Sequence, residues 1–297
     1  MQKTQLSESV ALSRIIYGLW RLTDDKDRSP SHILAKIEAC LNQGITSFDQ
    51  ADIYGGYSSE TLFGSALKTA PALRDQMEII TKCNIVTPTG VYADRRLKYY
   101  DTSQAHIQQS VDRSLREMGL EQIDLLLLHR PDPLMDAAET GAALDSLIQS
   151  GKVKALGVSN FRPFDLALLQ ANMTNKLVCN QIEINLQDNS ALTNGDLAYL
   201  QRKNIVPMAW SPLAGGTLFN NNNPVLAERL RDMSLIYGVE PASLAVAWLL
   251  KHPSNILPVM GSNRVDRIKC FSEALSVELD RQSWYELYEA ANGHEVP

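Results

Sequence analysis

Short apolar runs alternate with longer amphipathic segments along almost the whole chain. Eight runs rich in Ile, Val and Leu have the length and composition of buried parallel strands, at residues 14–19, 46–49, 78–82, 123–129, 155–159, 179–184, 206–210 and 256–259. Helical periodicity follows each run, at residues 31–42, 59–68, 103–118, 140–149, 163–170, 194–203, 225–237, 241–251, 264–271 and 281–291. The pattern is therefore of the α/β class.

Eight strand–helix units predict one closed (β/α)₈ TIM barrel with extra C-terminal helices. A doubly wound open sheet is the rival fold, but it carries a Gly-rich first turn. Residues 18–23 read GLWRLT here and lack that motif. No stretch resembles a linker, so we expect residues 1–297 to form a single domain. Two connections, 83–102 and 213–224, exceed ordinary loop lengths, and we expect the second to act as a mobile flap.

Composition narrows the class of partner. The net charge is −6 and no Lys/Arg-rich block occurs, which argues against nucleic acid and anionic membranes. The four cysteines form no CxxC pair, so neither a disulfide framework nor a zinc site is expected. The N-terminus has no apolar signal region and the apolar runs are too short to span a bilayer. We expect a cytoplasmic protein, and its oligomeric state is not predicted.

Four reactive side chains come at or just after the ends of consecutive predicted strands. Asp49 and the nearby Tyr54 follow the second strand, Lys82 ends the third and His129 ends the fourth. In such barrels the carboxyl ends of the strands form the active site. Each residue alone has an ordinary structural explanation, as a cap, a loop aromatic, a rim lysine or a core histidine. Four of them at one rim are harder to explain that way.

Together these groups have the chemistry of a proton donor. An ammonium at Lys82 lowers the pKa of a nearby phenol, and Asp49 keeps that ammonium charged. Tyr54 then protonates a carbonyl oxygen that His129 orients. No side chain donates a hydride, so the reduction needs a cofactor.

At this point the sequence resembles the aldo/keto reductase family, in its bacterial oxidoreductase branch. The resemblance lies in residues 44–55 (GITSFDQADIYG), Lys82, 128–132 (LHRPD), 157–161 (GVSNF), Asn180-Gln181 and 210–213 (WSPL). It implies that Asp49, Tyr54, Lys82 and His129 are a catalytic tetrad and that small carbonyl compounds are the substrates.

The resemblance also implies contacts to NADPH. Ser159, Asn160 and Gln181 would hydrogen-bond the nicotinamide carboxamide, and Trp210 would stack on its ring, although Trp210 is equally explained as a core aromatic. Ser211 and Leu213 would open a loop over the pyrophosphate, and Trp20 would line the substrate pocket. Weaker hints at an aromatic pocket come from the remaining aromatics of the loops, namely Tyr57, Tyr92 and Phe219.

The choice between NADPH and NADH depends on the 2′-phosphate. The segment 261–268 offers a helix start with hydroxyl, amide and guanidinium groups that suit an anion. By resemblance its cofactor contacts are Gly261, Ser262, Asn263 and Arg267. The sequence departs from the family in having Gly261 for a common lysine, and Cys270-Phe271 for a Glu-Asn pair that contacts adenine, which puts the adenine contacts in doubt.

Three functions remain open from the sequence. The first is the NADPH-dependent carbonyl reductase. The second is a lyase in which Lys82 forms a Schiff base, which would need a lowered lysine pKa that Asp49 opposes. The third is a barrel that binds NADPH as a regulatory or sensor protein with little turnover.

Overall fold

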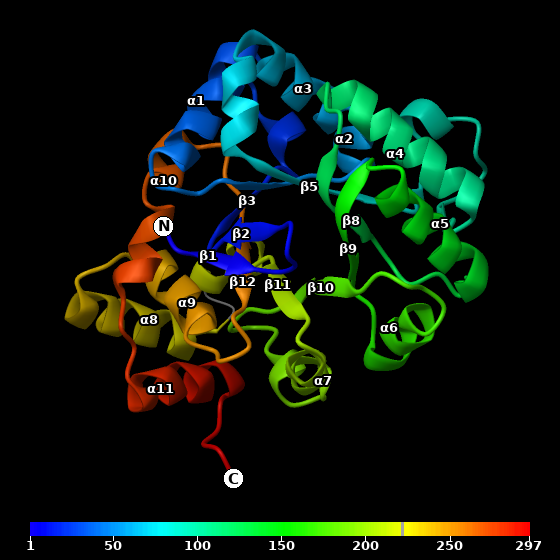
Figure 1. Ribbon diagram of the computed structural model, residues 1–297. Coiled ribbons are helices and arrows are strands. Elements are labelled where there is room, and N and C mark those ends of the chain that lie inside the picture. Colours follow the sequence, from blue (N-terminus) through cyan, green and yellow to red (C-terminus); the bar gives the residue numbers. More distant parts are fainter. Residues whose placement is uncertain (221–222) are drawn as a thin grey trace.

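In a computed structural model, which describes residues 1–220 and 223–297, eight parallel strands close into a barrel. The strands are β3 (Ile16–Gly18), β4 (Ser47–Asp49), β5 (Glu78–Cys83), β8 (Ile123–Leu128), β9 (Val153–Ser159), β10 (Leu177–Glu183), β11 (Val206–Trp210) and β12 (Leu257–Met260). They follow one another around the ring in chain order, and β12 pairs with β3 to close it (Figure 1). The predicted barrel is confirmed.

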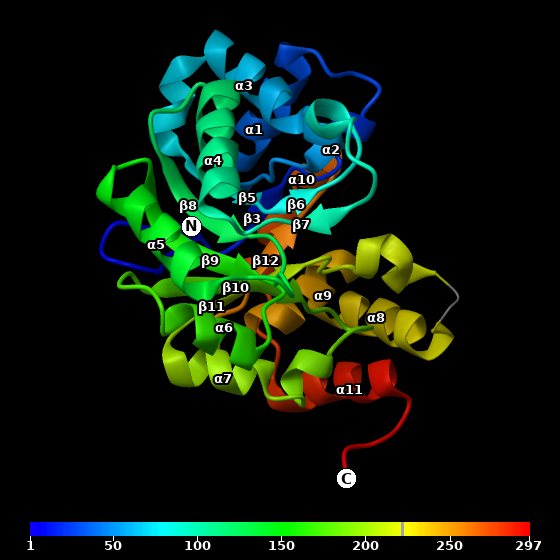
Figure 2. The ribbon, with the colours of Figure 1, turned by 90° about the vertical axis from the view of Figure 1, so that its right-hand side faces the viewer.

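Helices surround the strands on the outside (Figures 1 and 2). They are α1 (Pro30–Leu41), α2 (Tyr54–Tyr57), α3 (Ser59–Thr69), α4 (Gln104–Met118), α5 (Ala137–Gln149), α6 (Pro163–Gln170), α7 (Asp196–Lys203), α8 (Pro224–Tyr237), α9 (Pro241–Leu250), α10 (Val265–Ile268) and α11 (Arg281–Asn292). Within the described residues no single helix is long and apolar enough to cross a membrane, although α8 and α9, bent by 89°, pass that test as a pair.

Local signals set the ends of these helices. The Ser103 hydroxyl accepts a hydrogen bond from the backbone of α4, and Gly119 ends that helix in the left-handed conformation at φ 67°. The fourth predicted helix, 140–149, starts three residues earlier than expected, because Asp136 caps α5 at Ala137. Single-residue capping chemistry therefore decides boundaries that hydrophobic periodicity leaves open.

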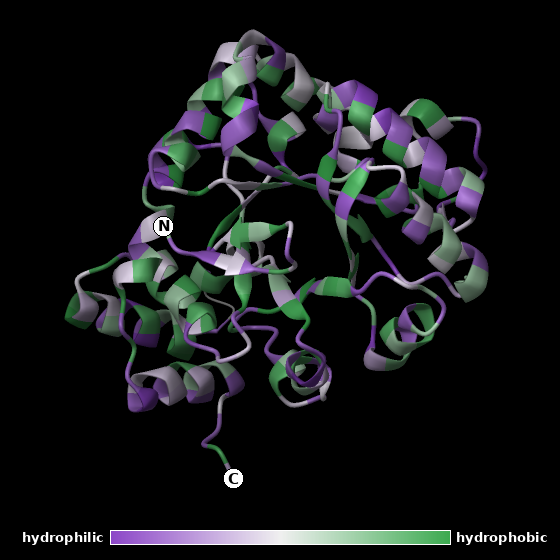
Figure 3. Ribbon diagram, in the orientation of Figure 1, coloured by the Kyte–Doolittle hydropathy of each residue, from purple (hydrophilic) through white to green (hydrophobic). Residues whose placement is uncertain are grey.

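The barrel strands alternate between two hydrophobic layers. On β8, Leu125 and Leu127 pack inside the barrel, whereas Leu126 and Leu128 pack against the helices. On β5, Ile80 faces the interior while Ile79 lies in the outer layer. Figure 3 shows the strands as mostly hydrophobic and the outer helices as mixed. Since side chains alternate along a strand, every second residue at the carboxyl end points into the mouth of the barrel.

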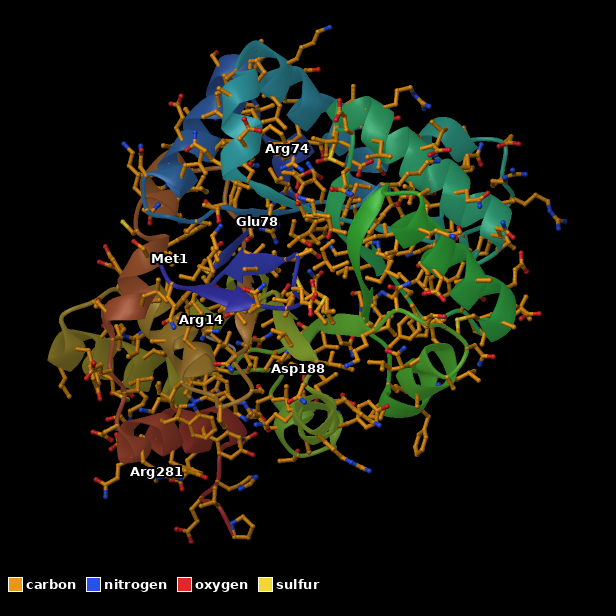
Figure 4. The ribbon with its side chains drawn as sticks, in the orientation of Figure 1. Met1, Arg14, Arg74, Glu78, Asp188 and Arg281 are labelled. Carbon is orange, nitrogen blue, oxygen red and sulfur yellow. The ribbon has the colours of Figure 1, made fainter. Side chains whose placement is uncertain are left out.

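The opposite end of the barrel is covered by a hairpin that we did not predict. Strands β1 (Lys3–Gln5) and β2 (Ala11–Ser13) pair antiparallel, and Figure 1 shows them across the centre of the ring. Leu12 packs with the interior residues of the barrel. Lys3 bonds Glu78 at 2.6 Å, and Arg14, labelled with Glu78 in Figure 4, donates to the Asn255 carbonyl at 3.2 Å.

The long loops carry more structure than the sequence predicted. The connection 83–102 contains a small antiparallel sheet of β6 (Ile85–Val86) and β7 (Tyr99–Tyr100). The connection 213–224 contains a 3-10 turn at Ala214–Phe219, and its residues 221–222 lie outside the described part of the chain, so the flap hypothesis stays a prediction. The predicted helix 264–271 is wrong in length, since α10 makes one turn and a 3-10 segment, Phe271–Ser276, follows.

Candidate active site

Polar residues end the inward-facing rows of the barrel strands. Asp49 is the last residue of β4, Lys82 lies on the same face of β5 as Ile80, and Ser159 and Gln181 lie at the ends of β9 and β10. His129 follows β8, and its backbone N–H donates to the Cys83 carbonyl at 2.9 Å. The carboxyl ends of five neighbouring strands thus bring these side chains to one mouth.

Lys82 is the centre of this mouth. Its ammonium donates to Asp49 Oδ2 at 2.7 Å, to the Gln50 carbonyl at 2.8 Å and to the Tyr54 hydroxyl at 3.0 Å. Three acceptors use all three of its protons. Both members of the ion pair are buried, with side-chain exposures of 0% and 3%. Tyr54 begins α2, whose Gly55 and Gly56 take positive φ of 59° and 63° and so allow the tight turn after the phenol.

The surroundings shift the pKa values of these groups in different directions. Burial acts to lower the pKa of Lys82, but Asp49 and Tyr54 outweigh it and the net shift is upward. Burial raises the pKa of Tyr54, and the Lys82 ammonium only partly opposes this. Lys82 does act to lower the pKa of the phenol, as predicted, but the sequence argument omitted desolvation, which is larger and makes the net shift upward.

His129 is neutral at physiological pH. Burial first, and then the charges of Lys82 and Arg130, hold its pKa well below the usual value. Its ring stands edge-on to Tyr54, with centroids 5.9 Å apart at 76°. Among the described residues its Nδ1 is buried without a hydrogen-bond partner. A neutral imidazole beside the phenol can orient a carbonyl oxygen without contributing charge.

The predicted carboxamide contacts form a chain of hydrogen bonds with one another. Gln181 donates to Asp49 Oδ1 at 3.0 Å, and Ser159 donates to the Gln181 carbonyl at 2.8 Å. Asn160, in the left-handed conformation at φ 59°, donates to Ser159 at 2.8 Å and accepts from the Trp210 indole at 2.9 Å. The indole is thus fixed at the end of β11 next to the catalytic mouth.

A cleft of about 1510 Å³ extends from this mouth over the ends of β11, β12 and β3. Of the residues that the sequence analysis proposed for substrate and cofactor, these line it: Trp20, Ser159, Asn160, Gln181, Trp210, Ser211, Leu213, Gly261, Ser262 and Arg267. Trp20 is 59% exposed at its edge, and Phe219 also lines it.

Three residues proposed for this cleft do not line it, so the hints from Tyr57 and Tyr92 are wrong, and the Asn263 contact to the cofactor stays a prediction. The Asn263 side chain points elsewhere, because it accepts from Lys36 at 3.0 Å and donates to the Arg21 carbonyl at 2.6 Å. Tyr57 and Tyr92 are buried against each other, with ring centroids 5.2 Å apart, and line no part of the cleft. Their rings pack with Arg113 instead.

The far end of the cleft is rich in exposed cations. Arg264 is bound to Asp266, whereas Arg267 makes no ion pair among the described residues. Phe271, one of the departures from the family, is 7% exposed and packs on Tyr17 at 6.4 Å. Cys270 lines the cleft but offers no charged or amide group.

Two cations near Tyr54 escaped the sequence analysis. Arg130 and Lys98 line the cleft, and the charge of both acts on His129. The Arg130 guanidinium lies 6.0 Å from the Trp210 ring. Its backbone is held on both sides by Asn84, which donates to the Arg130 carbonyl at 2.8 Å and accepts from its N–H at 3.0 Å. Arg130 belongs to the motif at residues 128–132, but the sequence alone did not show that its side chain faces the cleft.

Comparison with known proteins identifies the family. A model described as "Aldo/keto reductase family" matches residues 14–292. The chain belongs to the aldo/keto reductase family. It is 56% identical to a 6-dehydroglucose reductase from Agrobacterium fabrum and 42% identical to the uncharacterized oxidoreductase YcsN from Bacillus subtilis, over the full length of the chain and of each relative. This aldo/keto reductase also matches the fold of one from Klebsiella pneumoniae solved with NADP and acetate, with a TM-score of 0.80 at 22% identity, over 98% of this chain and 94% of the other.

Proposed function

We propose that this protein reduces aldehydes and ketones to alcohols with NADPH, and that Tyr54 supplies the proton. The observation that carries the proposal is the buried triad of Lys82, Asp49 and Tyr54, joined by hydrogen bonds of 2.7 and 3.0 Å at the open mouth of the barrel. A phenol held next to a fixed ammonium is suited to donate a proton to an oxygen that becomes negative during the reaction.

The cleft fits a dinucleotide. Its volume exceeds the roughly 300–1,000 Å³ of ordinary small-molecule sites, which leaves space for cofactor and substrate together. Gln181 keeps its amide oxygen free of protein partners among the described residues, and Trp210 offers an aromatic face. Arg267 lines the far end of the cleft and makes no ion pair within residues 1–220 and 223–297, so its guanidinium can bind a phosphate. Bound NADPH would supply the hydride.

The protein's own groups then handle the proton. His129, neutral and next to Tyr54, donates a hydrogen bond that orients the substrate carbonyl. As the carbonyl oxygen gains charge, the Tyr54 hydroxyl transfers its proton to that oxygen. Lys82 stabilises the phenolate that remains, and Asp49 together with Gln181 fixes the ammonium. A raised phenol pKa keeps Tyr54 protonated until negative charge develops on the substrate oxygen.

The geometry disfavours the lyase alternative. A Schiff base needs a neutral amine, but Asp49 and Tyr54 raise the pKa of Lys82, and all three ammonium protons are engaged. Lys82 also lies behind Tyr54 and does not line the cleft. The charged, enclosed lysine is consistent with an electrostatic role and not with attack on a substrate.

We further propose that the substrate is a polar, hydroxyl-rich aldehyde. Arg130 and Lys98 line the cleft, and their charges act on His129, so they offer hydrogen-bond donors that an apolar substrate would leave without partners. Two relatives, 56% and 37% identical, carry the name 6-dehydroglucose reductase. A sugar aldehyde of this kind carries several hydroxyl groups, which match the donors on the walls of the cleft.

Steady-state assays with NADPH test the function. The wild-type protein should reduce hydroxylated aldehydes, with higher kcat/KM than alkyl aldehydes of the same length. Tyr54→Phe should lower kcat by about 10²–10⁴, while the affinity for NADPH stays within about twofold. Tyr199→Phe on α7, which lies outside the cleft, is the matched control. Full activity in Tyr54→Phe would refute the proton-donor role, and NADPH binding without turnover on any carbonyl would instead support the sensor.

A further inference from the structure

Asn84 is a buried residue beside the catalytic mouth to which the proposed reaction gives no role. It directly follows β5, two residues after Lys82, and is fully buried. Its backbone has a φ of 92°, in the left-handed region that residues other than glycine rarely adopt. A residue in such a conformation persists only where its surroundings hold it, and strained positions of this kind gather at functional sites. The contacts of Asn84 are therefore informative.

The side-chain amide of Asn84 binds both backbone groups of Arg130. Its Nδ2 donates to the Arg130 carbonyl at 2.8 Å, and its Oδ1 accepts from the Arg130 N–H at 3.0 Å. The backbone ladder between β5 and β8 ends just before this point, where the His129 N–H donates to the Cys83 carbonyl at 2.9 Å. An amide side chain offers a donor and an acceptor, as a peptide group does. Asn84 thus extends the pairing of the two strands to Arg130 after its own backbone has turned away.

The backbone of Asn84 holds a second loop of the cleft. Its carbonyl accepts from the Asp101 N–H at 2.9 Å, at the far end of the connection 83–102. Lys98 belongs to that connection, just before β7, and lines the cleft. Asn84 therefore joins the two loops that carry Lys98 and Arg130.

Arg130 is held at both ends of its side chain. Asn84 fixes its backbone, and its guanidinium lies 6.0 Å from the Trp210 ring, within the range of a cation–π interaction. An arginine side chain loses much rotamer freedom when it becomes immobilised. A side chain that is already held in place loses less of that freedom when a ligand binds, so the ligand binds more tightly.

We propose that Asn84 is a positioning residue that sets the place of Arg130 in the cleft and thereby the affinity for the hydroxyl-bearing end of the substrate. The proposal rests on the proposed function, in which Arg130 donates hydrogen bonds to substrate hydroxyl groups. Asn84 itself does not line the cleft, so it acts through Arg130 and not on the reacting atoms. Its loss should weaken the binding of polar substrates and leave proton transfer from Tyr54 unchanged.

Asn84→Gly tests this role, because glycine accepts a positive φ and the substitution removes only the amide. The KM for erythrose, a hydroxylated four-carbon aldehyde, should rise about tenfold while kcat stays within about twofold. For butanal, the alkyl aldehyde of the same length, both constants should stay within about twofold. An unchanged Kd for NADPH reports that the variant is folded. Asn204→Gly, the same substitution at a left-handed asparagine that ends α7 outside the cleft, is the matched control and should change none of these values.

Two further variants show whether Asn84 acts through Arg130. In Arg130→Met the KM for erythrose should also rise about tenfold, and adding Asn84→Gly should change it little further, because the positioned group is already absent. Asn84→Asp provides a pH profile. A protonated aspartate offers the same donor and acceptor as asparagine, whereas a carboxylate only accepts. Relative to wild type, its KM for erythrose should be nearly normal at about pH 5 and should rise toward the Asn84→Gly value at about pH 8, because burial raises the pKa of a carboxyl group.

The results that overturn the proposal are distinct from those that overturn the proposed function. An unchanged KM for erythrose in Asn84→Gly refutes the positioning role alone. Equal increases in KM for erythrose and butanal also refute it, since they indicate a general distortion of the mouth, as do additive effects of Asn84→Gly and Arg130→Met. A wild-type protein that reduces neither aldehyde with NADPH refutes the proposed function and this role with it.

Discussion

The two ends of the cleft hold their positive charges in opposite ways. At the catalytic end, Lys82 is fully buried and already bonded to Asp49 and Tyr54. At the phosphate end, Arg21 and Arg267 are exposed and have no carboxylate partner among the described residues. A buried charge must be paired before any ligand arrives, because desolvation without a partner is costly. An exposed charge remains hydrated, so it can stay unpaired until an anion binds.

This difference matches what each end has to do. Charge appears at the catalytic end only during the reaction, so the groups that stabilise it work best when they are already in position. The phosphate end is proposed to bind a ligand whose charge is permanent, and there the ligand would complete the arrangement. Lys82 should therefore matter for both folding and chemistry, whereas Arg267 should matter for affinity alone.

Lys82→Met should have the largest effect. It removes the stabiliser of the phenolate, so kcat should fall by about 10²–10⁴. It also leaves Asp49 buried without its cation, which should lower the free energy of unfolding by about 3–5 kcal/mol. Steady-state kinetics and urea denaturation measure the two losses. Lys152→Met, which breaks an exposed pair with Asp112, is the matched control and should cost less than about 1 kcal/mol. Equal costs in the two variants would contradict the comparison.

Arg267→Ala should have the next effect, restricted to one cofactor. Loss of its contact to the 2′-phosphate should weaken NADPH binding by about tenfold while NADH binding changes little. Arg264→Ala should change both affinities less, because Arg264 is already bound to Asp266. Dissociation constants of both variants for NADPH and for NADH measure these effects. A similar loss of NADPH and NADH affinity would mean that Arg267 does not contact the 2′-phosphate.

The residues of the catalytic end could be predicted from the sequence because they lie on regular strands. Lys82 and Asp49 end apolar strands, and period-two alternation with Ile80 directs Lys82 into the barrel. Strand length and polarity suffice to place such residues. The direction of the pKa shift of Tyr54 could not be predicted in this way, because the desolvation that raises this pKa depends on packing from several strands.

The phosphate end and the hairpin were harder to predict because they depend on contacts between distant segments. Asn263 fits a cofactor-binding motif, yet Lys36, 227 positions away, takes its side-chain oxygen. Arg21 lies in a stretch with no regular pattern, and only the barrel topology brings it to Gly215. The β1–β2 hairpin is three residues per strand, too short for periodicity to mark.

Lys36→Met should have a smaller effect, spread over the whole phosphate end of the cleft. Without its ammonium, Asn263 loses one of the two bonds that hold it, and the Arg21 carbonyl is held less firmly. We expect affinities for NADPH, NADH and adenosine 2′-monophosphate to fall by about threefold each. Titration of all three ligands separates this pattern from that of Arg267→Ala, which should change NADH affinity little. Loss of dinucleotide affinity alone would show that Lys36 does not position the Arg267 segment.

The layer outside the barrel provides a second contrast with Lys82. Thr81, the preceding residue, faces the helices and donates to Glu60 at 2.5 Å, and Ser114 donates to the other carboxyl oxygen at 2.8 Å. Glu60 is 1% exposed and bonds to hydroxyl groups only. Burial raises its pKa to about 8, and the nearby acids Asp52 and Glu117 act in the same direction. Glu60 is thus buried neutral, whereas Lys82 is buried charged.

Glu60→Gln should have the smallest effect on catalysis and cofactor binding, and should instead change how stability depends on pH. In the unfolded chain Glu60 loses its proton near pH 4.5, but in the folded protein it keeps it up to about pH 8. Between those values the folded state binds the extra proton, so wild-type stability should fall with rising pH by roughly 1 kcal/mol per pH unit from this group. Glutamine resembles the protonated acid and does not titrate. The wild-type protein should therefore lose stability relative to Glu60→Gln between pH 5 and 8, with no further change above that range. Glu121→Gln at the surface should show no such trend, and a pH-independent difference between wild type and Glu60→Gln would mean that Glu60 is ionised in the fold.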